Sequence, residues 1–102
     1  MSDQRIYKYA LTPTDRLTLL LPEGAAPLCV QTQNGEPWLW ALVDAAQPLA
    51  PMAFVIHGTG HPVLPGCGAH NYLGTFQLHG GALVFHVFGP FAPVEEPPDA
   101  TQ

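Results

Sequence analysis

Proline and glycine recur so often along this chain that they limit every regular element to a short segment. The 102 residues include 12 prolines and 10 glycines. Pro48 and Pro51 interrupt the one stretch, residues 41–53, that is rich in helix-forming residues, and proline cannot continue a helix. No segment shows a helical period over three turns. Short segments bounded by turn residues are typical of an all-β domain.

The segments between the turn residues have the composition and alternation of strands. Asn34-Gly35 is the strongest hairpin signal, because both residues tolerate a positive φ. A second hairpin is expected around His79-Gly80-Gly81, and Gly89-Pro90 is expected to end the last strand. The predicted strands are residues 4–11, 16–21, 28–33, 38–43, 53–57, 72–78 and 82–88, with a proline-containing loop at 44–52 and a glycine-rich loop at 58–71.

Six or seven such strands suit a small antiparallel sandwich or a partly closed barrel. The sequence therefore predicts an all-β fold, with a single β domain over residues 4–92. Residues 93–102 are rich in proline and acidic side chains, and we expect them to form a flexible tail.

Two of the predicted strands, residues 38–43 and 82–88, are apolar on both faces. They should be central in a sheet or covered by a partner subunit. Trp38 and Trp40 share a strand face, and the preferred interpretation places them in the core, with stacking on a flat ligand as the alternative. His86 is expected to be a core or interface histidine with satisfied hydrogen bonds, and a candidate pH-sensitive point in assembly.

Charged residues make up only 11% of the chain, against about 25% in an average globular domain. Between Asp44 and Glu95 there is no Asp, Glu, Lys or Arg. Monomeric domains use charges to stay soluble and to protect exposed strand edges. A stretch of this length without charge predicts that another copy covers part of the surface, so we expect a homo-oligomer.

The same composition limits the classes of partner. Arg5, Lys8 and Arg16 are the only Lys or Arg residues, so nucleic acid is not an expected partner, since such binding neutralises several phosphates. No run of 18 apolar residues exists, so no membrane association is expected. The first residues do not resemble a signal peptide, and Cys29 and Cys67 suit free thiols in a reducing compartment. We therefore expect a cytoplasmic protein.

Histidines and a cysteine gather in the second half of the sequence, where His57, His61, Cys67 and His70 offer ligand types that Zn²⁺ accepts. The spacing matches no usual zinc motif, and no carboxylate lies nearby in the sequence to orient an imidazole. Ser2 is the only serine, which argues against a serine triad, and Cys67 with His61 or His70 would be the only nucleophile–base pair. We predict no metal site, no cofactor and no catalytic residue, and keep a small histidine- or metal-dependent hydrolase as an alternative.

The segment Gly58-Thr59-Gly60 has two interpretations. Consecutive backbone N–H groups in such a turn can bind phosphate or carboxylate, but a tight turn is the more common use of these glycines. The helix of a dinucleotide-binding motif and the lysine of a P-loop are both missing. The length of the surrounding loop favours a binding role, because long irregular loops are often functional.

Several motifs in order carry a resemblance to a known family. They are Ile6-Tyr7-Lys8-Tyr9, Val30-Gln31-Thr32-Gln33-Asn34-Gly35, Leu39-Trp40-Ala41-Leu42-Val43-Asp44, His57-Gly58-Thr59-Gly60-His61, Leu73-Gly74-Thr75-Phe76-Gln77 and Leu83-Val84-Phe85-His86-Val87-Phe88. Over residues 5–88 the chain resembles an uncharacterised family of small proteins from tailed phages and prophages. The resemblance implies no catalytic role. It directs attention to Asp44, Thr59, Gly60 and His61, and it leaves Cys67 and His70 outside the shared pattern.

A phage protein of this kind would act in the cytoplasm of the host bacterium. Some phage inhibitors of bacterial immunity are compact oligomers that enclose nucleotide signals, and the resemblance is compatible with that mode. We therefore expect a non-enzymatic homo-oligomer that sequesters a small anionic or nucleotide signal of host defence. The alternatives are an inhibitor of a host protein, or a structural or assembly accessory of the phage. The candidate binding residues are Arg5, Tyr7, Trp40, Asp44, His57, Gly58, Thr59, Gly60 and His61.

Overall fold

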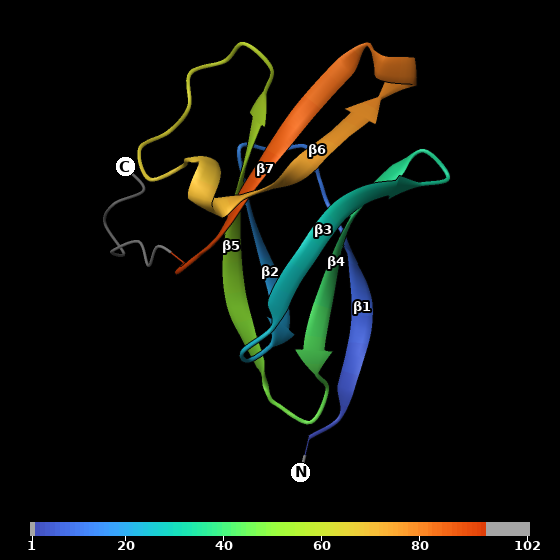
Figure 1. The fold of residues 1–102 in the computed structure, drawn as a ribbon, viewed down its shortest axis with the longest axis vertical. Coiled ribbons are helices and arrows are strands. Elements are labelled where there is room, and N and C mark those ends of the chain that lie inside the picture. Colours follow the sequence, from blue (N-terminus) through green and yellow to red (C-terminus); the bar gives the residue numbers. More distant parts are fainter. Residues whose placement is uncertain (1, 94–102) are drawn as a thin grey trace, which may run out of the picture.

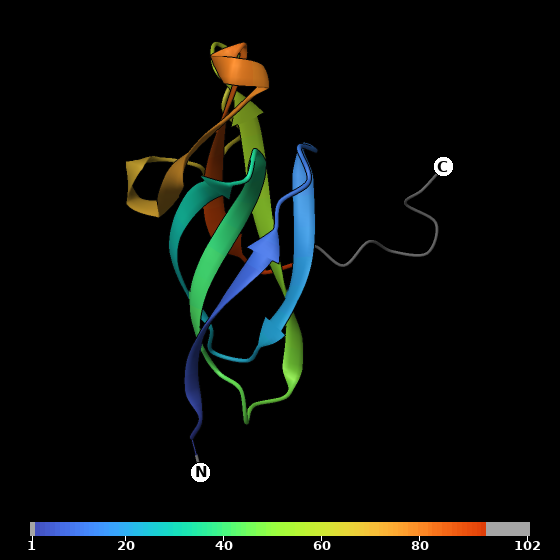
Figure 2. The same ribbon diagram turned by 90° about the vertical axis from the view of Figure 1, so that its right-hand side faces the viewer.

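Two antiparallel sheets lie face to face in the computed structural model of this chain, which describes residues 2–93. The first sheet has the strand order β1-β4-β3 and the second the order β2-β5-β7-β6. Figures 1 and 2 show the two layers from the front and from the side. The strands are β1 (Gln4–Ala10), β2 (Arg16–Pro22), β3 (Ala26–Gln33), β4 (Glu36–Asp44), β5 (Leu49–Gly58), β6 (Tyr72–Leu78) and β7 (Leu83–Phe91), with 3-10 turns η1 (Ala69–Asn71) and η2 (His79–Gly81).

This arrangement confirms the predicted all-β class and decides between its two forms. The seven strands of residues 2–93 form an open sandwich, because the two sheets do not join into a closed barrel. The hairpin at Asn34-Gly35 is confirmed, and both residues have the positive φ that the tight turn requires, 53° and 79°. The two strands that are apolar on both faces are central, since β4 lies between β1 and β3, and β7 lies between β5 and β6.

The core occupies the space between the sheets and is built by strand alternation. On β4, Leu39, Ala41 and Val43 point inward and are almost completely buried. The opposite sheet contributes Phe54, Ile56, Phe76 and Val87 to the larger of two buried clusters. The interpretation of Trp38 and Trp40 as core residues is wrong, because both lie on the other face of β4 and are only half-buried.

The largest differences from the predicted strand ends are at the start of β5 and the end of β7. The predicted loop at 44–52 is too long, because β5 already begins at Leu49. Pro51 is tolerated in this strand because β5 pairs there with β2 alone, opposite Leu20.

Likewise, β7 does not end at Gly89-Pro90 but continues to Phe91. In that part of β7 the only pairing is with β5, since β6 begins opposite Phe88, so the missing N–H of Pro90 costs no ladder bond on the β6 side. Gly89 is needed for packing, because a Cβ there would lie 2.7 Å from Phe54 Cδ1.

The strands and the loops between them extend from Gln4 to Phe91, within the predicted 4–92 domain. The predicted tail at 93–102 lies, after Pro93, outside the described residues. The helical turns within residues 2–93 are three residues each, and none could cross a membrane.

Candidate functional site

The residues proposed from the sequence as one binding site lie in separate parts of the folded chain. Asp44 ends β4 just before the turn that leads into β5, whereas His57 and Gly58 lie at the far end of β5. A strand of ten residues is about 33 Å long, so these two groups occupy opposite ends of the sandwich (Figure 1). A single chain therefore does not bring them together, and a pocket shared by two chains stays a prediction.

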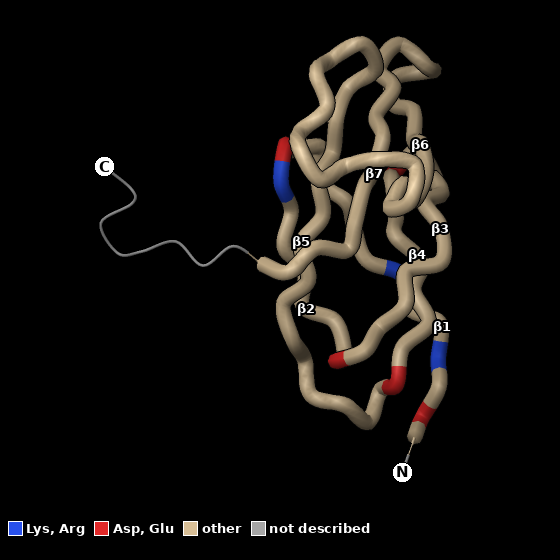
Figure 3. Tube along the Cα trace, turned by 60° about the vertical axis from the view of Figure 1, so that its left-hand side comes forward, with Lys and Arg blue, Asp and Glu red and all other residues tan. Residues whose placement is uncertain are grey.

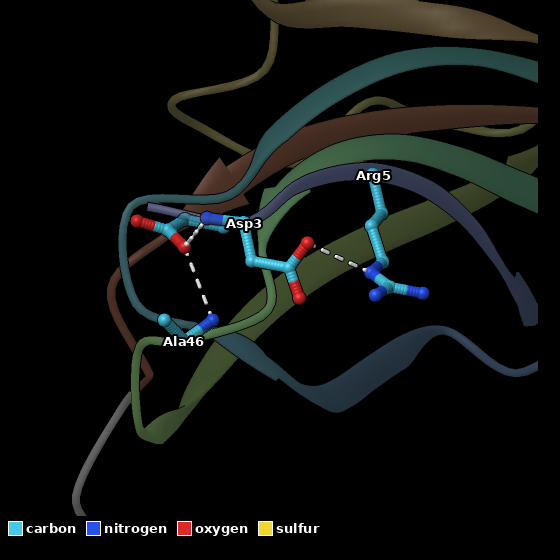
Figure 4. Close-up of polar contacts among 4 residues, drawn as sticks. Asp3, Arg5 and Ala46 are labelled. Atoms are coloured by element: carbon cyan, nitrogen blue, oxygen red, sulfur yellow. Dashed lines mark hydrogen bonds and ion pairs between the residues drawn. The ribbon is translucent and has the colours of Figure 1, made fainter. Parts of the chain in front are cut away.

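At the first end, Asp44 has a structural role that accounts for its place in the sequence. Its Oδ1 accepts the backbone N–H of Asp3 at 2.8 Å and that of Ala46 at 3.0 Å (Figure 4). These two bonds, the Asp3 bond first, hold the pKa of the Asp44 carboxyl below its usual value. Arg5 donates from Nε to Asp3 Oδ1 at 3.0 Å, and this exposed pair contributes little stability. Asp44 thus ties the start of β1 to the β4–β5 turn.

The outer side of the first sheet carries an apolar surface, which we call the tryptophan face. It comprises Ile6, Lys8, Trp38, Trp40 and Leu42, since cross-strand partners share a face and Ile6 pairs with Leu42 and Lys8 with Trp40. Ile6 is 62% exposed and Leu42 39%. Tyr7 points to the opposite side of β1, where it pairs with Ala41.

Lys8 lies across the tryptophan face and partly covers it. Its Nζ is 4.2 Å from the centre of the Trp38 ring and donates to Gln33 Oε1 on β3. The indole N–H groups of Trp38 and Trp40 are shielded from solvent and find no acceptor within residues 2–93. An unsatisfied buried donor costs about 1–3 kcal/mol, so this face is a costly arrangement for a chain on its own.

At the other end of the sandwich, the Gly58–His61 segment forms a tight turn. The His61 N–H donates to Gly58 O and the Thr59 N–H to Val84 O, both at 3.1 Å. Two of the four backbone N–H groups of this segment are therefore used within the chain. The tight-turn interpretation agrees with this geometry better than the anion-binding one does. Gly58, Thr59 and His61 line a small open hollow of about 300 Å³.

Above this turn, His86 is at the centre of a cluster of hydroxyl groups. Its Nε2 lies 2.6 Å from Thr59 Oγ1 and its Nδ1 2.7 Å from the hydroxyl of Tyr72, which also contacts Thr75. Since the Thr59 hydroxyl donates to Val84 O, it accepts from Nε2–H, and Nδ1 then accepts from Tyr72. The expectation of a hydrogen-bonded His86 is confirmed, although it lies on the outer face of β7 and not in the core.

His57 has a structural contact of its own. Its Nε2 accepts the Leu64 N–H at 3.1 Å, and its ring packs edge-on against Phe88. Nowhere in the described part of the chain do three His, Cys, Asp or Glu side chains come together in a way that could hold a metal ion. His57, His61, Cys67 and His70 therefore do not form the joint ligand set that the hydrolase alternative would use.

An open groove of about 900 Å³ lies on the outer side of the second sheet, and the sequence did not predict it. Arg16 and Thr18 on β2 lie beside Val55 and Ala53 on β5, their register partners. The β5–β6 loop, residues 59–71, supplies the opposite wall through Leu64, Pro65 and Cys67. We call this hollow the Arg16 groove.

Cys67 responds to its burial and to the charge of Arg16 across the groove. Burial raises the pKa of the Cys67 thiol, and the positive charge of Arg16 offsets part of that rise. The alternation of Arg16 and Thr18 with Leu17 and Leu19 indicates that they face away from the core. Which loop covers that face depends on long-range contacts, and no local signal in the sequence reports it.

The fold and these surfaces define a β-sandwich with one uncovered apolar face and one grooved face. The chain belongs to the family described as a domain of unknown function, DUF7352, whose model matches residues 2–97. No curated protein and no solved structure matches it.

Proposed function

We propose that this protein is a non-enzymatic binding protein that acts as a homo-oligomer and sequesters a small anionic or nucleotide ligand, in keeping with the phage-type role expected from its motifs. The observation that carries the proposal is the tryptophan face. Large apolar side chains that remain exposed side by side usually mark a contact surface. In this chain they lie on a regular sheet, which can pack against a second sheet about 10 Å away.

A second copy of the chain is the partner that the charges favour. Glu36 lies on the same side of β4 as Trp38, and Lys8 lies opposite Trp40. A two-fold axis passing near Trp38 would lay Lys8 of each copy close to Glu36 of the other, as an isologous contact requires. The uncharged stretch from β5 to β7, tan throughout in Figure 3, offers no comparable self-complementary pair.

Sedimentation velocity at micromolar concentration tests the oligomer directly. The wild-type chain is expected to sediment as a dimer or larger species. Ile6→Glu places a charge in the tryptophan face and should produce a monomer. Leu49→Glu is the matched control, because Leu49 is 64% exposed and Ile6 62%, yet Leu49 lies outside that face. It should leave the assembly unchanged.

Two results would contradict the proposal. A wild-type monomer would remove the oligomer and would favour the alternative in which the tryptophan face meets a different protein, as an inhibitor or assembly accessory would. Dissociation by Leu49→Glu as well as by Ile6→Glu would show that the tryptophan face is not the contact.

A further inference from the structure

We propose that the Arg16 groove is the ligand site, and that it takes a small molecule with an apolar body and a single anionic group that pairs with Arg16. This inference deepens the proposed function by naming its site and ligand class. Arg16 and Thr18 form one side of the groove and the β5–β6 loop the other.

The chain has three Lys or Arg residues, and two of them are already engaged by other groups. Arg5 is paired with Asp3, and Lys8 is engaged by Gln33 and the Trp38 ring. Arg16 forms no ion pair within residues 2–93, although Asp15 precedes it in the sequence. Its guanidinium can therefore bind a carboxylate, sulfonate or phosphate, with which it makes strong, often paired hydrogen bonds.

The other residues that line the groove indicate the chemistry of the rest of the ligand. Apart from Arg16, Thr18 and Cys67, the lining is apolar: Ala53, Phe54, Val55, Leu64, Pro65, Phe91 and Ala92. A volume of about 900 Å³ lies in the range of small-molecule sites, roughly 300–1,000 Å³. A ligand with several phosphates would bring charges for which the groove has no second cation. The groove therefore selects a single anionic group on an apolar or aromatic body.

Hydrogen bonds within the chain hold the β5–β6 loop, which forms one wall of the groove, in place. His57 accepts the Leu64 N–H, and the Cys67 N–H donates to Leu64 O. Asn71 closes the loop by accepting the Gly68 N–H at 2.9 Å and donating to Gly66 O at 2.9 Å. A wall that is already ordered lowers the entropic cost of binding a ligand. This order favours the interpretation of the groove as a binding site.

Fluorescence titration with two related probes tests the charge requirement. Anilinonaphthalene sulfonate has an aromatic body and one anionic group, and phenylnaphthylamine has nearly the same body without the charge. Arg16→Gln should raise the Kd of the sulfonate by about tenfold or more, because a charge-assisted bond is lost, and leave the Kd of the neutral probe unchanged. Arg5→Gln, which removes a cation elsewhere, should change neither.

The two cysteines locate the bound probe. Cys67 lines the groove, whereas Cys29 pairs with Trp40 on the first sheet. At a fixed protein concentration, the sulfonate should slow the alkylation of Cys67 by iodoacetamide, followed by peptide mass spectrometry, and leave that of Cys29 unchanged. Displacement of the sulfonate by AMP and not by adenosine would identify a nucleotide ligand, and displacement by decanoate a fatty acid.

An equal sulfonate Kd in the wild type and in Arg16→Gln would overturn the groove proposal, and so would protection of Cys29 in place of Cys67. These failures are distinct from failure of the oligomer. A monomer that still protects Cys67 through Arg16 keeps the groove and loses the assembly, whereas an oligomer without Cys67 protection loses the groove alone.

Discussion

The outer faces of the two sheets differ in how their apolar side chains are shielded from water. Both faces carry such side chains on the side away from the core. On the second sheet the β5–β6 loop folds back, so Val55 and Phe88 are buried although they belong to neither core cluster. On the first sheet Lys8 is the one side chain of residues 2–93 seen to lie across the tryptophan face, and Ile6 and Leu42 remain exposed. The chain covers much of one face itself and leaves the other exposed.

The largest expected effect is a loss of stability when a buried side chain is removed from the covered outer face of the second sheet. Phe88→Ala removes a ring that is 8% exposed and packs edge-on against His57 and Tyr72. Truncating a buried Phe costs about 3–5 kcal/mol, so the free energy of unfolding in urea should fall by that amount. Leu49→Ala, at a position that is 64% exposed, should cost under about 0.5 kcal/mol. Similar losses for the two variants would mean that the loop does not cover this face.

A smaller effect tests how the β5–β6 loop is attached to the second sheet. His57→Phe keeps an aromatic ring against Phe88 but removes the acceptor of the Leu64 N–H. A part-buried donor left without a partner costs about 1–3 kcal/mol. Amide hydrogen exchange at Leu64 should accelerate, while exchange at Leu39 in the core should change only by the global loss of stability. Unchanged protection of Leu64 would contradict the proposed attachment.

On the uncovered face the corresponding change should be milder. Lys8→Met removes the cation over the Trp38 ring and the bond to Gln33 but keeps most of the unbranched apolar stem. An exposed cation–π contact contributes about 0.5–1 kcal/mol. Tryptophan emission should shift to longer wavelength as the rings become more accessible to water. If Lys8→Met lowered the free energy of unfolding as much as Phe88→Ala does, Lys8 would cover the tryptophan face as fully as the β5–β6 loop covers the outer face of the second sheet.

The smallest expected effect is on the pH dependence of stability and of alkylation at Cys67 in the groove. Burial raises the pKa of the Cys67 thiol, so the folded chain holds this proton more tightly than the unfolded chain does. The resulting stabilisation is complete below the ordinary thiol pKa near 9.0 and is lost as pH rises through the higher folded value. Alkylation of Cys67 should therefore reach its half-maximal rate at a higher pH in the folded than in the unfolded chain. Arg16→Gln should raise that pH further. A shift in the opposite direction would contradict the burial of this thiol.

Local chemistry made much of the fold predictable. Asn34-Gly35 fixed one hairpin, and the alternation of β4 identified a central strand. Pro51 and Pro90 misled the prediction of the strand ends, because each lies where its strand has a neighbour on one side only, and this depends on the register of the whole sheet.

The candidate site was less accessible to sequence reasoning. The two-residue spacing of Trp38 and Trp40 showed that they share a face, but not which face meets the core. Asp44 holds the β4–β5 turn, and Thr59 connects the Gly58–His61 turn to β7, so both have structural contacts of their own. Arg16 and Cys67, far apart along the chain, meet only after β2 pairs with β5 and the β5–β6 loop folds back.

The two cysteines allow the contrast between the faces to be measured in one sample. Cys29 lies on the outer side of the first sheet and Cys67 in the groove of the second. If a second copy covers the tryptophan face, the alkylation rate of Cys29 should fall as the protein concentration rises from nanomolar to micromolar, while that of Cys67 stays constant. Rates that do not depend on concentration at either cysteine, or a fall at Cys67 alone, would contradict the account.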